Sequence, residues 1–314
     1  MSRTARSYLL LTIAAAIWGL AFVAQRAGAE FVDAFSFNAA RFVLGALSLL
    51  PVMVLLGRRG GTRPHPWRGV LLPGFVVGVI LFAGSTFQQL GVERTTAGNA
   101  GFVTGLYIVT VPLVGLLQGH RPSRWLWLGV VAAMSGLYLL TVTDGFSMGA
   151  GDALVLVGSV CWTAHILSIE YFSRRVDPLR LAFVQFVVCA ALSTIVAVTT
   201  QPHPFAGMVQ AALPIAYGGI MSVGVGFTLQ VVGQAGARAS VAALIMSLEA
   251  FFAALGGALL LGETMTLRGY VGCALMLAGI LLAQIGAPPH AMEPGLAVDE
   301  LVPPTSDLRP ADGT

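Results

Sequence analysis

The sequence predicts an all-α integral membrane protein with ten transmembrane helices in two inverted-topology five-helix repeats. This prediction depends on a composition poor in charge, on ten long apolar segments and on residues that recur between the two halves. Hydrophobic residues make up 56% of the chain and charged residues 10%, whereas soluble domains carry about 25% charged residues. A water-soluble fold with this composition would leave most of its surface apolar.

The apolar segments are long enough to cross a bilayer. A spanning helix contains roughly 20 mostly apolar residues, because the hydrocarbon core is about 30 Å thick. The runs are continuously apolar, which excludes the alternating pattern of a transmembrane barrel. We expect spans at 8–29, 33–57, 69–91, 97–118, 125–143, 150–173, 178–200, 209–232, 239–261 and 266–286.

The arginines predict the orientation of these spans. When the N-terminus is placed in the cytoplasm, twelve loop or end arginines fall on the cytoplasmic side and three on the other. Cytoplasmic loops are enriched in basic residues, so we expect both termini in the cytoplasm. All basic residues are Arg, as in GC-rich bacterial genomes, and the expected location is the bacterial inner membrane. The three arginines on the opposite side are Arg26, Arg94 and Arg268.

An internal repeat divides the chain into two halves. Trp18 and Asp33 recur as Trp162 and Asp177 at a shift of 144, and Arg41 then falls opposite Gln185. Further pairs with shifts of 141 to 143 are Pro73 and Pro214, Gln89 and Gln230, Gly129 and Gly272, and Gly136 and Gly279. Five spans per half invert the second half relative to the first, and transporters with such repeats bind solute near the midplane.

The expected boundaries follow from this repeat. They are a cytoplasmic N-terminal segment at 1–7, a first five-helix repeat at 8–143 and a second at 144–286. The remaining residues, 287–314, are rich in proline and acidic residues and poor in aromatic residues, which predicts a disordered cytoplasmic tail.

The motifs resemble the drug/metabolite transporter superfamily, specifically its EamA-type ten-helix branch. The resemblance covers roughly residues 8–286 and is carried by Trp18-Gly19, Arg41-Phe42, Gln88 to Pro112, Gly129 and Gly136, and Ser247 to Glu263. Two positions depart from the family pattern, since His120 stands opposite Glu263 and Ala250 replaces a frequent proline. The resemblance implies a central cavity lined largely by helices 1, 3, 4, 6, 8 and 9, with helix 2 behind it, and alternating access.

Three ionisable residues lie well inside the expected spans, where charge is costly. Glu249 either carries a coupling proton or meets a cationic substrate, or else makes a structural bond to a neighbouring helix such as that of Arg41. Arg41 either meets an anion or ties helix ends together as a packing residue. His165 either binds a proton or solute, or is a neutral residue bonded to another helix.

Uncharged polar and aromatic residues form a second group of candidates. Trp18 and Trp162 provide either an aromatic wall for a ligand or packing between the repeats. The amides and hydroxyls either line the pathway or only join helices. These residues are Gln88, Gln89, Asn99, Thr104, Tyr107 and Gln230.

The leading hypothesis is a secondary transporter that exports or exchanges a small metabolite or drug. No phosphate-binding GxxxxGK[ST] loop occurs, so we expect no ATP, no other cofactor and no metal. The expected partners are a small-molecule substrate, a coupling proton and the lipid bilayer, without nucleic acid, as a monomer or homodimer. The alternatives are a lipid-carrier flippase, which would need a laterally open cavity with a cationic headgroup pocket, and an intramembrane enzyme, for which no catalytic motif is found.

Overall fold

The computed structural model describes residues 3–58, 67–95, 97–119, 121–142, 148–260 and 266–285, and every regular element in these ranges is a helix. In chain order the elements are α1 (Arg3–Ala29), α2 (Ala34–Arg58), α3 (Arg68–Val92), α4 (Ala97–Thr104), α5 (Tyr107–Leu117), α6 (Arg124–Thr141), α7 (Ala150–Ser173), α8 (Pro178–Thr200), α9 (Ala212–Ala216), η1 (Tyr217–Phe227), α10 (Thr228–Gln234), α11 (Ala239–Met246), α12 (Leu248–Leu260) and α13 (Leu267–Gln284). The expected tail at 287–314, His120 and Glu263 lie outside the described residues.

Eight helical segments in the described part of the chain are long and apolar enough to cross a membrane. They are Thr4–Ala29, Ala34–Leu55, Arg68–Val92, Asn99–Leu117, Arg124–Thr141, Ala150–Ser173, Pro178–Thr200 and Ala212–Gln234. The ninth and tenth expected spans correspond to shorter apolar helices, Ala239–Ala253 and Leu267–Ala283. The all-helical membrane class is thus confirmed, whereas ten crossings and inversion of the halves stay predictions.

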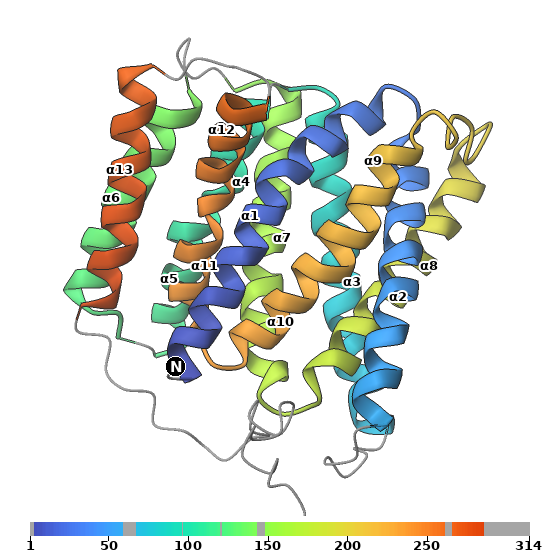
Figure 1. Ribbon diagram of the computed structural model, residues 1–314, viewed down its shortest axis with the longest axis horizontal. Coiled ribbons are helices and arrows are strands. Elements are labelled where there is room, and N and C mark those ends of the chain that lie inside the picture. The colour runs from blue at the N-terminus through green and yellow to red at the C-terminus, as the bar shows by residue number, and fades with distance from the viewer. Residues whose placement is uncertain are drawn as a thin grey trace, which may run out of the picture.

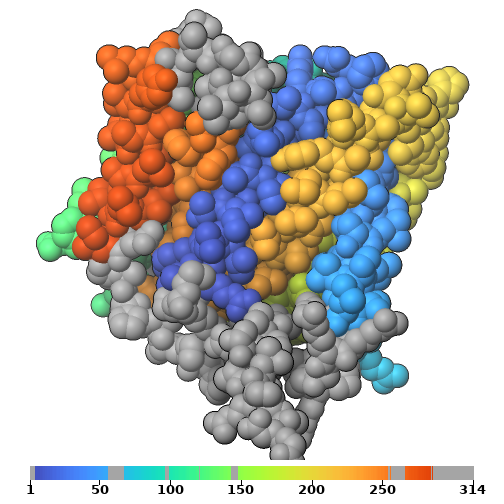
Figure 2. Space-filling model, viewed as in Figure 1, coloured from blue at the N-terminus to red at the C-terminus, as the bar shows by residue number. Residues whose placement is uncertain are grey.

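The helices form one bundle in which distant parts of the chain are neighbours. In Figure 1, α6 and α13 stand together at one edge, and α2 and α8 lie at the other. Between these edges α1 crosses the face of the bundle, and in Figure 2 it runs between α12 on one side and the α9–η1–α10 segment on the other. The first helix is therefore packed mainly against elements from the second half of the chain.

Two expected spans are broken rather than continuous. The segment expected at 97–118 divides into α4 and α5, and the N–H of Ile108 donates to the carbonyl of Gly105 at 3.0 Å. The segment expected at 239–261 divides at Ser247, whose carbonyl accepts from the N–H of Ala250 at 3.2 Å. Such i to i+3 bonds tighten the chain locally. Glu249 therefore lies in the first turn of α12, not halfway along a continuous helix as we expected.

The segment expected at 209–232 begins at Ala212 and contains the π-helix η1. Small residues of η1 and α2 let the two elements approach closely. Gly45 faces Val223, and Gly224 faces the Ser48 hydroxyl. The small and polar stripe of Arg41, Gly45 and Ser48 on α2 accordingly packs against η1. π-Helices are rare and frequently occur at functional sites.

Helices at equivalent positions in the two halves begin in the same way. Asp33 precedes α2 and accepts from the N–H of Ser36 at 3.0 Å, and Asp177 precedes α8 and accepts from the N–H of Arg180 at 2.8 Å. Side-chain oxygens at these positions satisfy the free N–H groups of the first turn. Asp33 and Asp177 are 144 positions apart, which is the shift of the sequence repeat.

Glycines form the contact between α6 of the first half and α13 of the second half. Gly129 lies against the carbonyl of Gly279, and Gly136 lies against the carbonyl of Gly272. A Cβ atom added at Gly136 would be 2.5 Å from the Gly272 oxygen. Because the sequence repeat matches Gly129 with Gly272 and Gly136 with Gly279, exchanging the two halves converts one contact into the other.

Candidate functional site

A cavity lies between the two halves of the bundle. Its walls come from α1, α2, α3, α4, α5, α7, η1, α10, α11 and α12, and the space including its opening is about 540 Å³. The lining residues are Trp18, Ala21, Phe22, Gln25, Arg41, Gln88, Thr104, Tyr107, Trp162, Ile166, Ser222, Phe227, Gln230, Met246 and Glu249.

Most of the residues singled out from the sequence meet at this cavity. Those that line it are Trp18, Arg41, Gln88, Thr104, Tyr107, Trp162, Gln230 and Glu249. Three others are not among the lining residues. Gln89 is fully buried and donates to the backbone carbonyl of Gln25 at 3.3 Å. Asn99 is half-buried in α4, and His165 is fully buried and bonded to Gln185.

The cavity brings together a carboxyl group and a guanidinium group that do not pair with each other. The Tyr107 hydroxyl donates to Glu249 Oε1 at 3.2 Å. The guanidinium of Arg41 lies 5.5 Å from the ring centroid of Phe37 and 5.1 Å from that of Phe42. Glu249 is thus bonded to Tyr107 and not to Arg41, the partner named in its structural alternative. Helix α2 contributes Arg41 to the lining instead of standing wholly behind the cavity.

Three aromatic rings form one wall. The Phe227 ring centroid lies 4.8 Å from that of Trp18 and 5.9 Å from that of Trp162, and the rings of Phe227 and Trp162 are stacked. The indole N–H of Trp18 donates to the carbonyl of Ser222 at 3.2 Å. That of Trp162 donates to Gln88 Oε1 at 2.7 Å. Both indoles are held in position, which leaves apolar ring surface beside the cavity.

Amide groups continue from this wall along the cavity. Gln88 Nε2 donates to Gln25 Oε1 at 3.3 Å. Gln230 is 2% exposed and its Oε1 has no hydrogen-bond partner among the described residues. Gln25 was not among the residues predicted from the sequence, although a glutamine inside the first apolar segment is the same signal that identified Gln88 and Gln89.

Other lining residues gave no sequence signal of their own. Phe227, Phe22 and Met246 are apolar residues in apolar segments. Ser222 contributes a backbone carbonyl to the Trp18 indole, and its place on the lining depends on the course of η1. Only the packing of the helices identifies these residues as part of the cavity.

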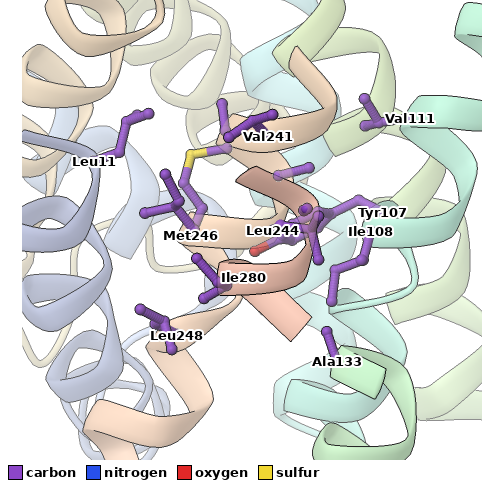
Figure 3. Close-up of a cluster of buried hydrophobic side chains, with 14 of the residues drawn as sticks. Leu11, Tyr107, Ile108, Val111, Ala133, Val241, Leu244, Met246, Leu248 and Ile280 are labelled. Carbon is purple, nitrogen blue, oxygen red and sulfur yellow. The ribbon is translucent and has the colours of Figure 1, made fainter. Parts of the chain in front are cut away.

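Apolar packing closes the bundle on the side of the cavity nearer the start of α1. This cluster contains Leu11, Val111, Leu244 and Ile245, and it is continuous with Tyr107 at the cavity. Figure 3 shows Leu11, Val111, Leu244 and Tyr107 as members of this cluster. All five side chains are at most 5% exposed, so this part of the bundle is apolar and closely packed.

Polar contacts join α1 and α3 at the other end. Arg26 donates to the carbonyl of Val92 at 2.9 Å and to that of Glu93 at 3.5 Å. Burial raises the pKa of the Glu93 carboxyl, Asp33 adds to the rise and Arg94 opposes it. At this end of the bundle the Arg26 side chain joins α1 to main-chain carbonyls at the end of α3. The packing at the opposite end is apolar.

The described residues contain no group of three or more His, Cys, Asp or Glu arranged to hold a metal ion. The cavity instead offers one guanidinium, one carboxyl, three glutamine amides and five aromatic side chains. This combination of a few polar groups with aromatic walls is typical of sites that bind small organic molecules.

Apolar helices around a central cavity lined by polar and aromatic residues define a polytopic membrane protein, and comparison with known proteins identifies its family. The chain belongs to the EamA-like transporter family, whose model matches residues 5–142 and again 149–284. This result confirms the resemblance inferred from the motifs and makes the protein a membrane transporter.

Individual relatives agree with this assignment. A protein of Archaeoglobus fulgidus named as an uncharacterized transporter is 32% identical over 276 residues, which is 88% of this chain and 84% of that protein. A Bacillus subtilis protein with the same kind of name is 23% identical over 288 residues, which is 87% of this chain and 92% of that protein. A solved crystal structure has the same fold with a TM-score of 0.72 at 19% identity, covering 89% of this chain and 96% of its own.

Proposed function

We propose that the protein is a secondary transporter that moves a small amphipathic solute across a bacterial inner membrane, by export or exchange. The observation that carries the proposal is the central cavity, where Arg41 and Glu249 line one space without pairing. An ionisable side chain inside a membrane is costly and is usually retained for a function. Two such groups in one cavity suit a solute that moves together with a charged species or in exchange for one.

The chemistry of the lining indicates the kind of solute. Arg41 can meet an anionic or hydrogen-bond-accepting group, since a guanidinium presents several donors. The rings of Trp18, Trp162 and Phe227 can cover an apolar body. Glu249 can carry a proton in exchange for the solute or meet a cationic group. The solute that fits best has one polar end and one apolar face.

Alternating access would follow from two inverted five-helix repeats. Support comes from the matched starts of α2 and α8, from the glycine contacts of α6 with α13 and from the paired matches of the family model. In such transporters the solute site lies between the repeats and the halves move around it. The apolar cluster at Leu11 and Leu244 would then separate to open the side that is closed here.

The test begins with a growth and uptake screen. A strain that overproduces the protein is challenged with amino acids, sugars, nucleosides and toxic cations, and each hit is measured with purified protein in proteoliposomes. Accumulation that exceeds that of empty liposomes supports the proposal. The lipid-carrier flippase is tested in the same liposomes with a fluorescent lipid, and lipid translocation without solute uptake would contradict solute transport.

A further inference from the structure

A second polar pair lies outside the lining of the cavity. His165 on α7 and Gln185 on α8 are both fully buried, and His165 Nε2 lies 2.9 Å from Gln185 Oε1. His165 Nδ1 and Gln185 Nε2 have no hydrogen-bond partner among the described residues. Buried polar atoms are nearly always bonded, so an unpaired set of this kind requires an explanation.

The pair lies directly behind the aromatic wall. The ring centroid of His165 is 5.7 Å from that of Trp162 and 6.0 Å from that of Phe227, and both contacts are edge-to-face. Trp162 and Phe227 line the cavity, whereas His165 and Gln185 do not. The two rings thus separate the polar pair from the solute space.

The sequence repeat relates this pair to the cavity. At a shift of 144, Trp162 corresponds to Trp18, His165 to Ala21 and Gln185 to Arg41. Trp18, Ala21 and Arg41 all line the cavity. The unpaired polar side chains therefore occupy the positions in the second half that the first half uses for its part of the lining.

The helices that carry these residues meet in a symmetric way. Phe42 and Phe186 follow Arg41 and Gln185, are themselves 144 positions apart, and contact each other with ring centroids 6.4 Å apart. A contact between equivalent residues lies on the axis that relates the two halves. Arg41 and Gln185 are consequently placed on opposite sides of that axis, one at the cavity and one behind its wall.

We propose that His165 and Gln185 form a second solute subsite, which opens when the cavity faces the other side of the membrane. This inference rests on the proposed transport function and on the inverted repeat. In an inverted repeat the two opposite-facing states are related by exchange of the conformations of the halves. Trp162, His165 and Gln185 then take the place at the solute that Trp18, Ala21 and Arg41 have here.

The free atoms define the group that this subsite takes. Because Gln185 Oε1 accepts from His165 Nε2, the neutral imidazole has an acceptor left at Nδ1, and Gln185 keeps a donor at Nε2. One donor beside one acceptor suits a hydroxyl, a protonated carboxyl or a primary amide. The Arg41 side suits an anion, so an anionic solute is held less tightly at the His165–Gln185 side and is released there.

Cysteine accessibility tests the subsite without knowledge of the solute. In a background with Cys161, Cys189 and Cys273 replaced by Ser, one of four positions is changed at a time: Ala21→Cys, His165→Cys, Gln185→Cys and Ser159→Cys. Right-side-out and inside-out membrane vesicles are treated with a membrane-impermeant maleimide. The control Ser159 lies on α7 like His165 and is buried, but its hydroxyl donates to the carbonyl of Thr104 at 3.0 Å, away from the pair.

We expect Ala21→Cys to be labelled from one side, His165→Cys and Gln185→Cys from the opposite side, and Ser159→Cys from neither. Two variants report on the subsite, so failure of one to fold leaves the other. If both stay unlabelled, or are labelled from the same side as Ala21→Cys, the subsite is refuted while the transport function stands. If Ala21→Cys is also unlabelled from both sides, no cavity opens and the proposed function itself fails.

Discussion

The Tyr107 hydroxyl donates a hydrogen bond to Glu249 Oε1 at 3.2 Å, across the breaks that separate α4 from α5 and α11 from α12. Both residues line the cavity, and each lies within the first two residues after its break. The carboxyl therefore has a neutral partner instead of the cation that the sequence suggested. A carboxyl with a neutral partner in an apolar bundle can take up and release a proton without breaking an ion pair.

Glu249→Gln is expected to stop coupled transport while leaving the fold intact. Glutamine keeps the shape and still accepts from Tyr107, but it cannot titrate. We expect normal insertion and a transport rate that no longer depends on pH. The rate is measured in proteoliposomes with the solute found in the screen, from pH 5.5 to about pH 8, because buried carboxyls titrate around this range. The control Tyr107→Phe removes the bond and keeps the carboxyl, so its pH dependence should survive. An unchanged pH profile in Glu249→Gln would leave the carboxyl with a structural role only.

Arg41→Gln is expected to weaken binding of an anionic solute. A hydrogen bond to a charged group contributes about 1.5–3 kcal/mol, which corresponds to roughly a 10- to 150-fold change in affinity. The measured quantity is the solute concentration at half-maximal uptake. Arg41→Lys is the matched control, because it keeps the charge while losing the planar guanidinium that lies beside Phe37 and Phe42. Equal affinity in all three proteins would show that Arg41 only packs α2 against its neighbours.

The sequence predicted most of this architecture, because the length and continuity of apolar segments are enough to identify membrane helices. It did not predict the breaks at Gly105 and Ser247, since hydropathy does not record where an i to i+3 bond replaces an i to i+4 bond. The π-helix η1 was missed for the same reason. These local changes of backbone geometry place Glu249 and Ser222 at the cavity.

The candidate site was predicted in part. Polar residues inside apolar segments pointed to Gln88, Gln230 and Glu249, which line the cavity. The same rule selected His165, which shares a helical face with Trp162 at a spacing of three. Periodicity gives the direction of a side chain but not its depth. His165 packs edge-to-face against Trp162 and is not among the residues that line the cavity.

Reporter fusions should decide between ten crossings and eight. With both termini cytoplasmic, fusions at Ala287 and near Asp144 report opposite compartments in either case. A fusion at Thr264 lies between α12 and α13, and it reports the outer compartment only if the shorter helices Ala239–Ala253 and Leu267–Ala283 both cross. We expect outer-compartment signals at Asp144 and Thr264 and a cytoplasmic signal at Ala287. A cytoplasmic signal at Thr264 would reduce the number of spans to eight.

Glu93 is expected to make stability depend on pH. Its pKa is raised in the folded protein by burial and by Asp33, so the folded state holds a proton that the unfolded chain has already released. The contribution of Glu93 to the free energy of unfolding is fully present below the ordinary carboxyl pKa, about 4.3. It is lost as the pH rises through the raised pKa of the folded state. Glu93→Gln should therefore melt like the wild type at about pH 4 and at a higher temperature near pH 7, pH values chosen on either side of that window. The exposed Glu30→Gln serves as control, and equal melting shifts for the two variants would contradict this role of Glu93.

The glycine contacts between α6 and α13 should be sensitive to a single methyl group. A Cβ at Gly136 would lie 2.5 Å from the Gly272 carbonyl oxygen. Because this oxygen belongs to the main chain, the two helices must separate to admit the methyl group. Overpacking of this kind costs about 1–3 kcal/mol. We expect Gly136→Ala to lower the melting temperature of the detergent-purified protein. Gly101→Ala is the control, since nothing lies within 4 Å of the added Cβ on α4 and alanine favours a helix over glycine by about 1 kcal/mol. If Gly136→Ala melts no lower than Gly101→Ala, the close approach of α6 and α13 does not stabilise the bundle.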